Sequence, residues 1–146
     1  MGEDAIPGRS EQELEDIEQK LNVKLPQDFR EIQLAYTLCL LGGISILNIS
    51  KLYNPNIIDE TIAMRDAIDI EHKYILLEND RESVILLNTA DAPAVLWVDS
   101  IAIERLNDLE PHESNSWNTF QEFFEYLINI EVEDREDEAR RNNSIL

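Results

Sequence analysis

Apolar side chains recur at helical spacing near the start of the chain. Leu14, Ile17 and Leu21 lie three and four positions apart, which places them on one face of a helix. Ser10 and Glu13, which flank the start of this pattern, have the spacing of a capping box, in which each side chain satisfies a free backbone amide of the other residue. We therefore expect a helix that begins near Ser10 and ends near residue 22.

A second helix is expected after Pro26, because proline suits the first helical position, where its missing N–H would have had no partner. Gly42 and Gly43 tolerate the positive φ that ends many helices, so they mark its end. Its predicted inward face consists of Phe29, Ile32, Tyr36 and Leu40. The short, β-branched segment 44–49 then predicts a strand. A third helix is expected to follow, with one face formed by Ile57, Thr61, Met64 and Ile68.

Three apolar runs come next, at Tyr74–Leu77, Val84–Leu87 and Ala94–Val98. The polar segments between them have the length of hairpin loops and are too short for crossover helices. The runs therefore predict an antiparallel meander, and their nearly continuous apolar character indicates that both faces of the sheet are covered. The alternation at Ile101 and Ile103 favours a further edge strand.

A polar connection is expected at residues 108–118, and a second capping box follows at Thr119 and Glu122. The final helix should dock on the sheet through a face that comprises Trp117, Phe120, Phe124, Leu127 and Ile128. Beyond this face, pairs of opposite charge four positions apart favour helix by about 0.2–0.5 kcal/mol each. These pairs are Glu131–Arg135, Glu136–Arg140 and Asp137–Arg141.

The pattern as a whole predicts an α+β fold, with a mainly antiparallel meander of about four to six strands flanked by about four helices. We expect a single domain over residues 10–130, a loose N-terminal lead at 1–9, and an acidic C-terminal helix or tail at 131–146.

Charge is the most unusual property of the composition. The chain has 31 acidic and 12 basic side chains, which give a formal net charge of −19. Such a chain repels phosphate backbones and anionic lipids, so we expect it to bind neither nucleic acid nor membranes directly. Solubility and the recognition of a basic partner explain the charge about equally well. Cys39 is the single cysteine, and the start of the chain has no secretory pattern, so we expect a cytoplasmic protein.

Motifs that would carry chemistry are missing from the sequence. None of the four glycines falls in a dinucleotide or Walker motif. His72 and His112 lie far apart, no second cysteine completes a zinc site, and no acidic cluster has the EF-hand spacing. Ser45 lacks the glycines of a nucleophile elbow. We therefore expect no enzyme activity, no cofactor and no metal.

Four stretches of the chain resemble the SUKH superfamily. They are IEQKLNVKLPQDFR at 17–30, Gly42–Gly43, AVLWVD at 94–99 and TFQEFFEYL at 119–127, and the similarity spans about residues 10 to 130. The resemblance implies an α+β domain with a mainly antiparallel sheet and without catalytic residues. Bacterial members look like immunity proteins that bind and neutralise a cognate toxin, often a nuclease or a nucleic-acid deaminase. Eukaryotic members look like regulatory scaffolds.

The short length favours the immunity role over that of a regulatory adaptor with no toxin partner. A toxin that acts on nucleic acid carries a basic surface, and the carboxylates of an inhibitor can occupy that surface in place of phosphates. The predicted contact residues are acidic side chains on the loops and edges of the meander, and ordinary solvated charge is the alternative for each of them. They are Glu78, Asp80, Glu82, Asp91, Asp99 and Glu104.

Overall fold

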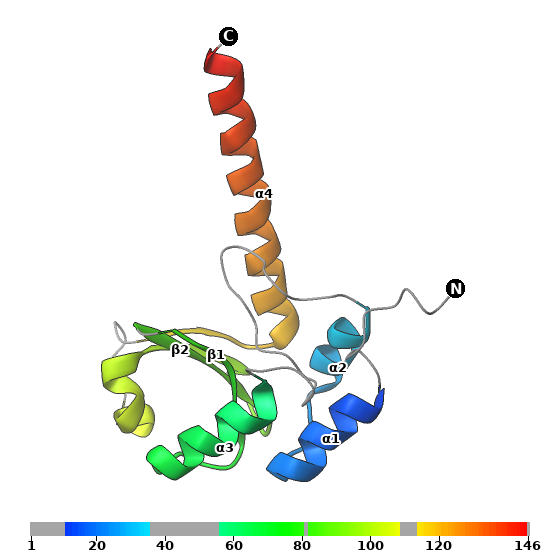
Figure 1. Cartoon of the computed structure of the whole chain (residues 1–146), viewed down its shortest axis with the longest axis vertical. Helices are drawn as coiled ribbons and strands as arrows, with labels where there is room; N and C mark the ends of the chain where they lie inside the picture. The colour runs from blue at the N-terminus through cyan, green and yellow to red at the C-terminus, as the bar shows by residue number, and fades with distance from the viewer. Residues whose placement is uncertain (1–10, 36–55, 81, 109–113, 146) are drawn as a thin grey trace.

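A computed structural model describes residues 11–35, 56–80, 82–108 and 114–145 (Figure 1). Within these ranges the chain has an α+β fold with a four-stranded sheet. The helices are α1 (Glu11–Leu21), α2 (Gln27–Ala35), α3 (Ile57–Ala67), the 3-10 helix η2 (Ser100–Asp108) and α4 (Phe120–Ile145). The strands are β1 (Tyr74–Asn79), β2 (Ser83–Asn88), β3 (Val95–Asp99) and β4 (Ser114–Trp117). The predictions for residues 1–10, for Tyr36 and Leu40, for Gly42–Gly43 and for the strand at 44–49 lie outside the described residues.

The predicted meander is confirmed. The strands lie in the order β1-β2-β3-β4, and each pair of neighbours is antiparallel. Leu76 lies opposite Leu86, which in turn lies opposite Leu96, so side chains of one kind form a row across three strands. The register between β1 and β2 shifts between Leu76 and Glu78. Such a bulge bends the strand and increases its local twist.

Apolar residues on both faces of the sheet are buried, as the continuous apolar runs predicted. One face packs into a core that also contains residues of α1, α2, α4 and the start of α3; its sheet residues are Ile75, Leu77, Ile85, Leu87 and Val95. The other face is covered by the end of α3, the segment after it and η2; its sheet residues are Tyr74, Leu76, Val84, Leu86 and Val98. Alternate side chains along a strand point to opposite faces, so β1, β2 and β3 each contribute to both cores.

The first and last long helices follow their sequence signals. Helix α1 buries Leu14, Ile17 and Leu21 and ends where Asn22 adopts a positive φ of 56°. At the start of α4 the predicted capping box is present, because the Glu122 N–H donates to the Thr119 hydroxyl over 3.1 Å. The Glu122 carboxylate in turn accepts from the N–H of Asn118, the residue before Thr119, also over 3.1 Å.

The buried faces of α2 and α4 differ in part from the prediction. In α2, Phe29 is buried and Ile32 is half-buried as expected, but Gln33 is also buried. In α4, Phe123 is fully buried although it was not assigned to the face, whereas Ile128 is 37% exposed. The part of α4 beyond it extends away from the domain (Figure 1), so nothing in the described structure covers that position completely.

The predicted edge strand at Ile101 and Ile103 is wrong, because both residues lie in η2. Ile103 is buried and Ile101 is 92% exposed, so the two side chains do not share a covered face. The side chains of η2 that pack against the sheet are Ala102, Ile103 and Leu106, and this spacing is helical. A period of two in a short segment does not separate a strand from a tight helix.

The polar connection predicted at 108–118 contains a strand, β4. Its sequence is Ser-Asn-Ser-Trp, without the apolar alternation that reveals most strands. Its place is set by pairing with β3, where Trp117 lies opposite Val95 and Ser114 opposite Val98. Trp117 therefore belongs to the sheet, although it also packs against Phe123 of α4 with a distance of 4.8 Å between ring centroids.

Candidate functional site

The six predicted contact residues fall into three places. Four of them gather at the end of the sheet where β1 turns into β2, and we call this group the hairpin cluster: Glu78, Asp80, Glu82 and Asp99. The grouping follows from the register, because Ser83 at the start of β2 lies opposite Asp99 at the end of β3. The Ser100 N–H also donates to the carbonyl of Glu82 over 3.0 Å, which ties the start of η2 to the hairpin.

Local hydrogen bonds shape the hairpin cluster. The Asp80 carboxylate accepts from the Glu82 N–H at 3.4 Å, and the Glu78 carboxylate accepts from the Asn79 N–H at 2.9 Å. Glu78 is half-buried, whereas the other three residues of the cluster are exposed. Those three exposed carboxylates form no ion pair within the described part of the chain. Among the described residues, the end of the sheet therefore carries a concentration of negative charge.

Asp91 lies at the opposite end of the sheet, in the loop between β2 and β3. Its carboxylate accepts from the Asn88 side-chain amide at 2.7 Å and lies 3.5 Å from the Lys73 ammonium. Its own N–H donates to the Asn88 side-chain oxygen at 3.1 Å. The structure thus separates Asp91 from the hairpin cluster and gives it a role in holding its loop.

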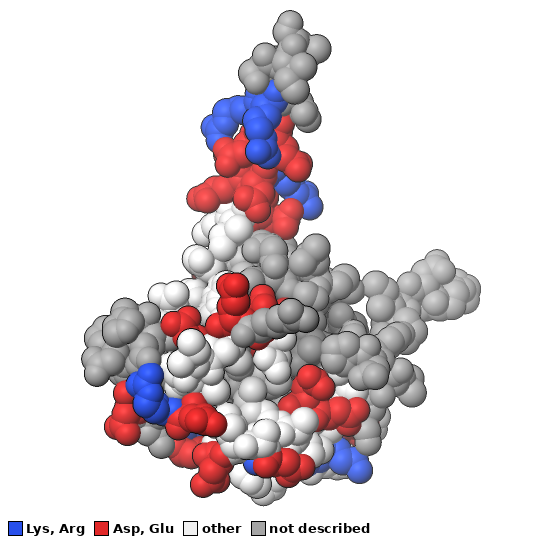
Figure 2. All heavy atoms as spheres, turned by 60° about the vertical axis from the view of Figure 1, so that its left-hand side comes forward, with Lys and Arg blue, Asp and Glu red and all other residues white. Residues whose placement is uncertain are grey.

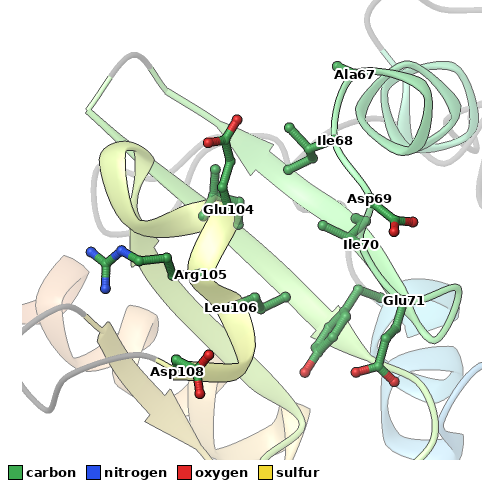
Figure 3. A pocket seen from close by; sticks show the side chains of 11 residues that line it. Ala67, Ile68, Asp69, Ile70, Glu71, Glu104, Arg105, Leu106 and Asp108 are labelled. Carbon is green, nitrogen blue, oxygen red and sulfur yellow. The ribbon is translucent and has the colours of Figure 1, made fainter.

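Glu104 lies on η2 and lines a cavity of about 300 Å³ between this helix and the segment that follows α3 (Figure 3). The floor of the cavity is mainly apolar and is formed by Ile68, Ile70, Tyr74, Ile103 and Leu106. Its rim is charged, with the carboxylates of Asp69, Glu71, Glu104 and Asp108 and the guanidinium of Arg105. Figure 3 shows the Arg105 side chain extending away from Asp69 and Glu71.

Hydrogen bonds fix the wall of the cavity that follows α3. The helix ends at Ala67, and the Ile68 N–H donates to the carbonyl of Met64 at 2.9 Å. Arg65 then joins two distant backbone segments, because its guanidinium donates to the carbonyl of Leu21 at 3.0 Å and to that of His72 at 2.7 Å. The turn from α3 into β1 is in this way anchored to the end of α1.

Tyr74 is the polar residue of the floor, and it is only 6% exposed. Burial raises the pKa of its hydroxyl; the nearby Lys73 ammonium acts to lower the pKa, and Glu71 and Asp91 act to raise it. Lys73 also lies 5.3 Å from the centroid of the Tyr74 ring, a cation–π distance. The ring is thus held in place at the boundary between the sheet and the cavity.

A second cavity of about 340 Å³ continues the first along the same side of the sheet. The two share Ala67, Ile68 and Ile103, and the second reaches Asn79 and Ser100 beside the hairpin cluster. A groove between α3 and η2 therefore runs from the hairpin cluster to Tyr74. We call it the α3–η2 groove.

Sequence reasoning missed three of the four carboxylates on the cavity rim: Asp69, Glu71 and Asp108. A signal for two of them was present, since Ile68-Asp69-Ile70-Glu71 alternates apolar and acidic residues. In an extended segment this alternation turns the isoleucines toward the core and the carboxylates toward solvent. The position of Asp108 depends on the path of η2, which the sequence did not predict.

Two kinds of site are absent from the part of the chain that the structure describes. No group of three or more His, Cys, Asp or Glu side chains is placed to hold a metal ion there. Among the described helices, none is both long and apolar enough to cross a membrane. Figure 2 shows that Asp and Glu dominate the charged surface of the body on the face it presents, and that both signs of charge occur on the projecting part of α4.

Comparison with known proteins identifies the family to which the chain belongs. Among curated proteins, none matches the chain. Residues 3–129 match a SUKH family model that is described as SMI1-KNR4 cell-wall. This match covers most of the chain, and the α+β architecture with an antiparallel four-stranded sheet agrees with a SUKH-like fold. The chain therefore belongs to the SUKH superfamily.

Proposed function

We propose that this protein is a bacterial immunity protein that binds a cognate toxin through its acidic surface and neutralises it without catalysis. Membership of the SUKH superfamily is compatible with this role. The observation that carries the proposal is the hairpin cluster, whose three exposed carboxylates have no ion-pair partner within the described residues. The net charge of −19 extends the same preference to the whole molecule.

The proposed toxin acts on nucleic acid, as a nuclease or a nucleic-acid deaminase does. Such an enzyme needs cationic groups to hold its substrate, and carboxylates placed as the phosphates would be can occupy those groups. Complementary charge can raise association rates from about 10⁵–10⁶ to 10⁸–10⁹ M⁻¹s⁻¹ at low salt. Fast capture suits an inhibitor that must intercept a newly made toxin.

A growth experiment tests the proposal. The product of the neighbouring gene is expressed as the candidate toxin in bacteria with and without this chain, and the chain is expected to restore growth. A variant with Glu78, Asp80 and Glu82 changed to lysine should rescue poorly. The matched control carries the same change of charge on exposed residues of α4, Glu133, Asp134 and Glu138, and it should rescue as the unchanged chain does. If no linked toxin is neutralised, the proposal is wrong.

A regulatory adaptor with no toxin partner is the second candidate, and the shape of α4 favours it. Side chains 132–141 of this helix are exposed, and this part of the helix projects away from the domain (Figure 1). A helix that is polar all round can bridge to another protein. Removal of residues 131–146 separates the two functions, because an adaptor that works through α4 loses its partner, whereas toxin capture by the hairpin cluster is retained.

A further inference from the structure

The cavity beside Tyr74 combines two chemical environments that suit opposite ends of one ligand. The isoleucine and leucine side chains of the floor are buried or half-buried, and the four carboxylates of the rim are exposed. Glu71 lies 3.8 Å from the Lys73 ammonium. The other three carboxylates, those of Asp69, Glu104 and Asp108, form no ion pair within the described residues. Because the same rim holds four carboxylates and one guanidinium, that of Arg105, a cation that enters the cavity meets net negative charge at its mouth.

Tyr74 places one polar group at the floor of the cavity. Only 6% of the surface of this residue is exposed, and the residue lines the cavity. Its hydroxyl has no hydrogen-bond partner among the described residues and is not sealed off from solvent. A polar group of a ligand that reaches the floor can therefore replace water at this hydroxyl.

We propose that this cavity receives an arginine side chain that projects from the basic partner protein. The proposal deepens the proposed function and rests on it for the existence of that partner. The methylene stem would lie along Ile70 and Leu106, as long basic side chains commonly cover apolar surface. The guanidinium would donate to carboxylates of the rim and to the Tyr74 oxygen.

An arginine fits these acceptors better than a lysine does. The acceptors are dispersed, with carboxylates on both walls and one hydroxyl at the floor. A guanidinium has five N–H donors in a planar fork and is weakly hydrated, whereas an ammonium is a compact and strongly hydrated charge. Arginine is also enriched among the residues that dominate binding energy at protein interfaces.

The test uses small probes and the whole chain. N-acetyl-arginine amide is titrated into ¹⁵N-labelled protein, with N-acetyl-citrulline amide as a neutral probe of nearly the same shape and N-acetyl-lysine amide as the alternative cation. The arginine probe is expected to shift the amide signals of Ile70, Tyr74 and Leu106. Citrulline at the same concentration should leave them in place, and lysine should bind more weakly.

Two variants assign the binding to the cavity. Tyr74→Phe removes only the hydroxyl and should weaken binding of the arginine probe about tenfold, the effect of one hydrogen bond to a charged group. The double variant Asp69→Asn with Glu104→Gln should weaken it at least as much. Glu15→Gln on the exposed side of α1, which belongs to neither the hairpin cluster nor the cavity, is the control and should leave it unchanged. Matching amide spectra away from the cavity show that each variant is folded.

Several results would overturn the proposal: equal shifts with citrulline, tighter binding of lysine, shifts confined to the hairpin cluster, or unchanged binding by Tyr74→Phe. The growth experiment is independent of these probes. If the arginine probe fails but the chain still rescues growth, the cavity proposal falls and the immunity role stands. If the probe binds and no toxin is neutralised, the arginine site stands and its assignment to a toxin falls.

Discussion

Thr61 makes the bond that joins α3 to the edge of the sheet, and its replacement by valine gives a sharp test of the structure. The Leu76 N–H donates to the Thr61 hydroxyl over 2.9 Å. In the order β1-β2-β3-β4, β1 is an outer strand of the described sheet, so this N–H points away from β2. Thr61 is 0% exposed and Leu76 is 1% exposed, so water does not readily replace the lost acceptor.

The expected cost follows from this burial. Valine keeps the shape of threonine but leaves the Leu76 N–H without its acceptor, which costs about 1–3 kcal/mol of the free energy of unfolding. For a domain of this size each kcal/mol corresponds to about 2–4 °C, so the Tm should fall by about 2–12 °C. The Leu76 amide should also exchange with solvent faster than its neighbours do.

Urea unfolding and amide hydrogen exchange measure the two effects. Thr61→Ser is the control, because it keeps the hydroxyl and loses one methyl group, at a cost of about 1 kcal/mol. The serine variant should retain the slow exchange of the Leu76 amide. A valine variant that is as stable as the unchanged chain, with unaltered exchange at Leu76, would show that the bond does not contribute to the fold.

Three further predictions concern α4, the hairpin cluster and Tyr74. The Asp28 carboxylate accepts from the Gln121 N–H at 2.9 Å in the first turn of α4, so Asp28→Ala should lower the free energy of unfolding by about 1–2 kcal/mol. Asp28→Asn keeps an accepting oxygen and should lower it by less; equal losses in urea unfolding would show that the accepting oxygen alone does not stabilise α4. Lysine at three acidic positions of the hairpin cluster should slow stopped-flow association with a toxin by tenfold or more at low salt and flatten its salt dependence, whereas the α4 control should not. Burial raises the pKa of Tyr74, so the unfolded chain loses this proton first above about pH 10, and the free energy of unfolding falls as pH rises. In Tyr74→Phe this fall, measured between about pH 9 and 11, should be shallower. An identical slope in the two proteins would contradict the raised pKa.

The sequence predicted most of the described elements because their signals are local. The meander was predictable from three apolar runs separated by loops too short for anything but hairpins. The start of α4 was predictable because Thr119 and Glu122 satisfy backbone amides within one turn. Helix α3 was predictable from apolar spacing, although the contact between Thr61 and the edge of β1 was not.

The elements that escaped prediction depend on distant partners. Three of the four side chains of strand β4 are polar, and its pairing with β3 makes it a strand. Helix η2 begins where the Ser100 N–H bonds to the carbonyl of Glu82, a residue of another loop. No pattern within either segment encodes these contacts.

The candidate site also has one part that the sequence predicts and one part that it does not. The hairpin cluster was predictable because carboxylates beside a tight turn must lie near one another and near solvent. Asp91 belongs to the opposite end of the sheet, which the alternation of strand directions would have shown. The cavity at Tyr74 could not be predicted, because it forms where the end of α3 meets η2, and η2 itself was misassigned.

The covered faces of the sheet limit where a partner can bind. The hairpin cluster and the cavity at Tyr74 would then affect different steps of binding. Since both faces are buried in the described structure, the sheet offers its ends and the α3–η2 groove, which joins the hairpin cluster to Tyr74. Exposed charge acts over distance and mainly sets the rate of association, whereas a buried anchor mainly sets the rate of dissociation. Changes in the hairpin cluster should therefore alter the association rate constant, and Tyr74→Phe the dissociation rate constant, in binding to one and the same partner. If both changes alter only association, the cavity does not hold an anchor, and charge alone accounts for binding.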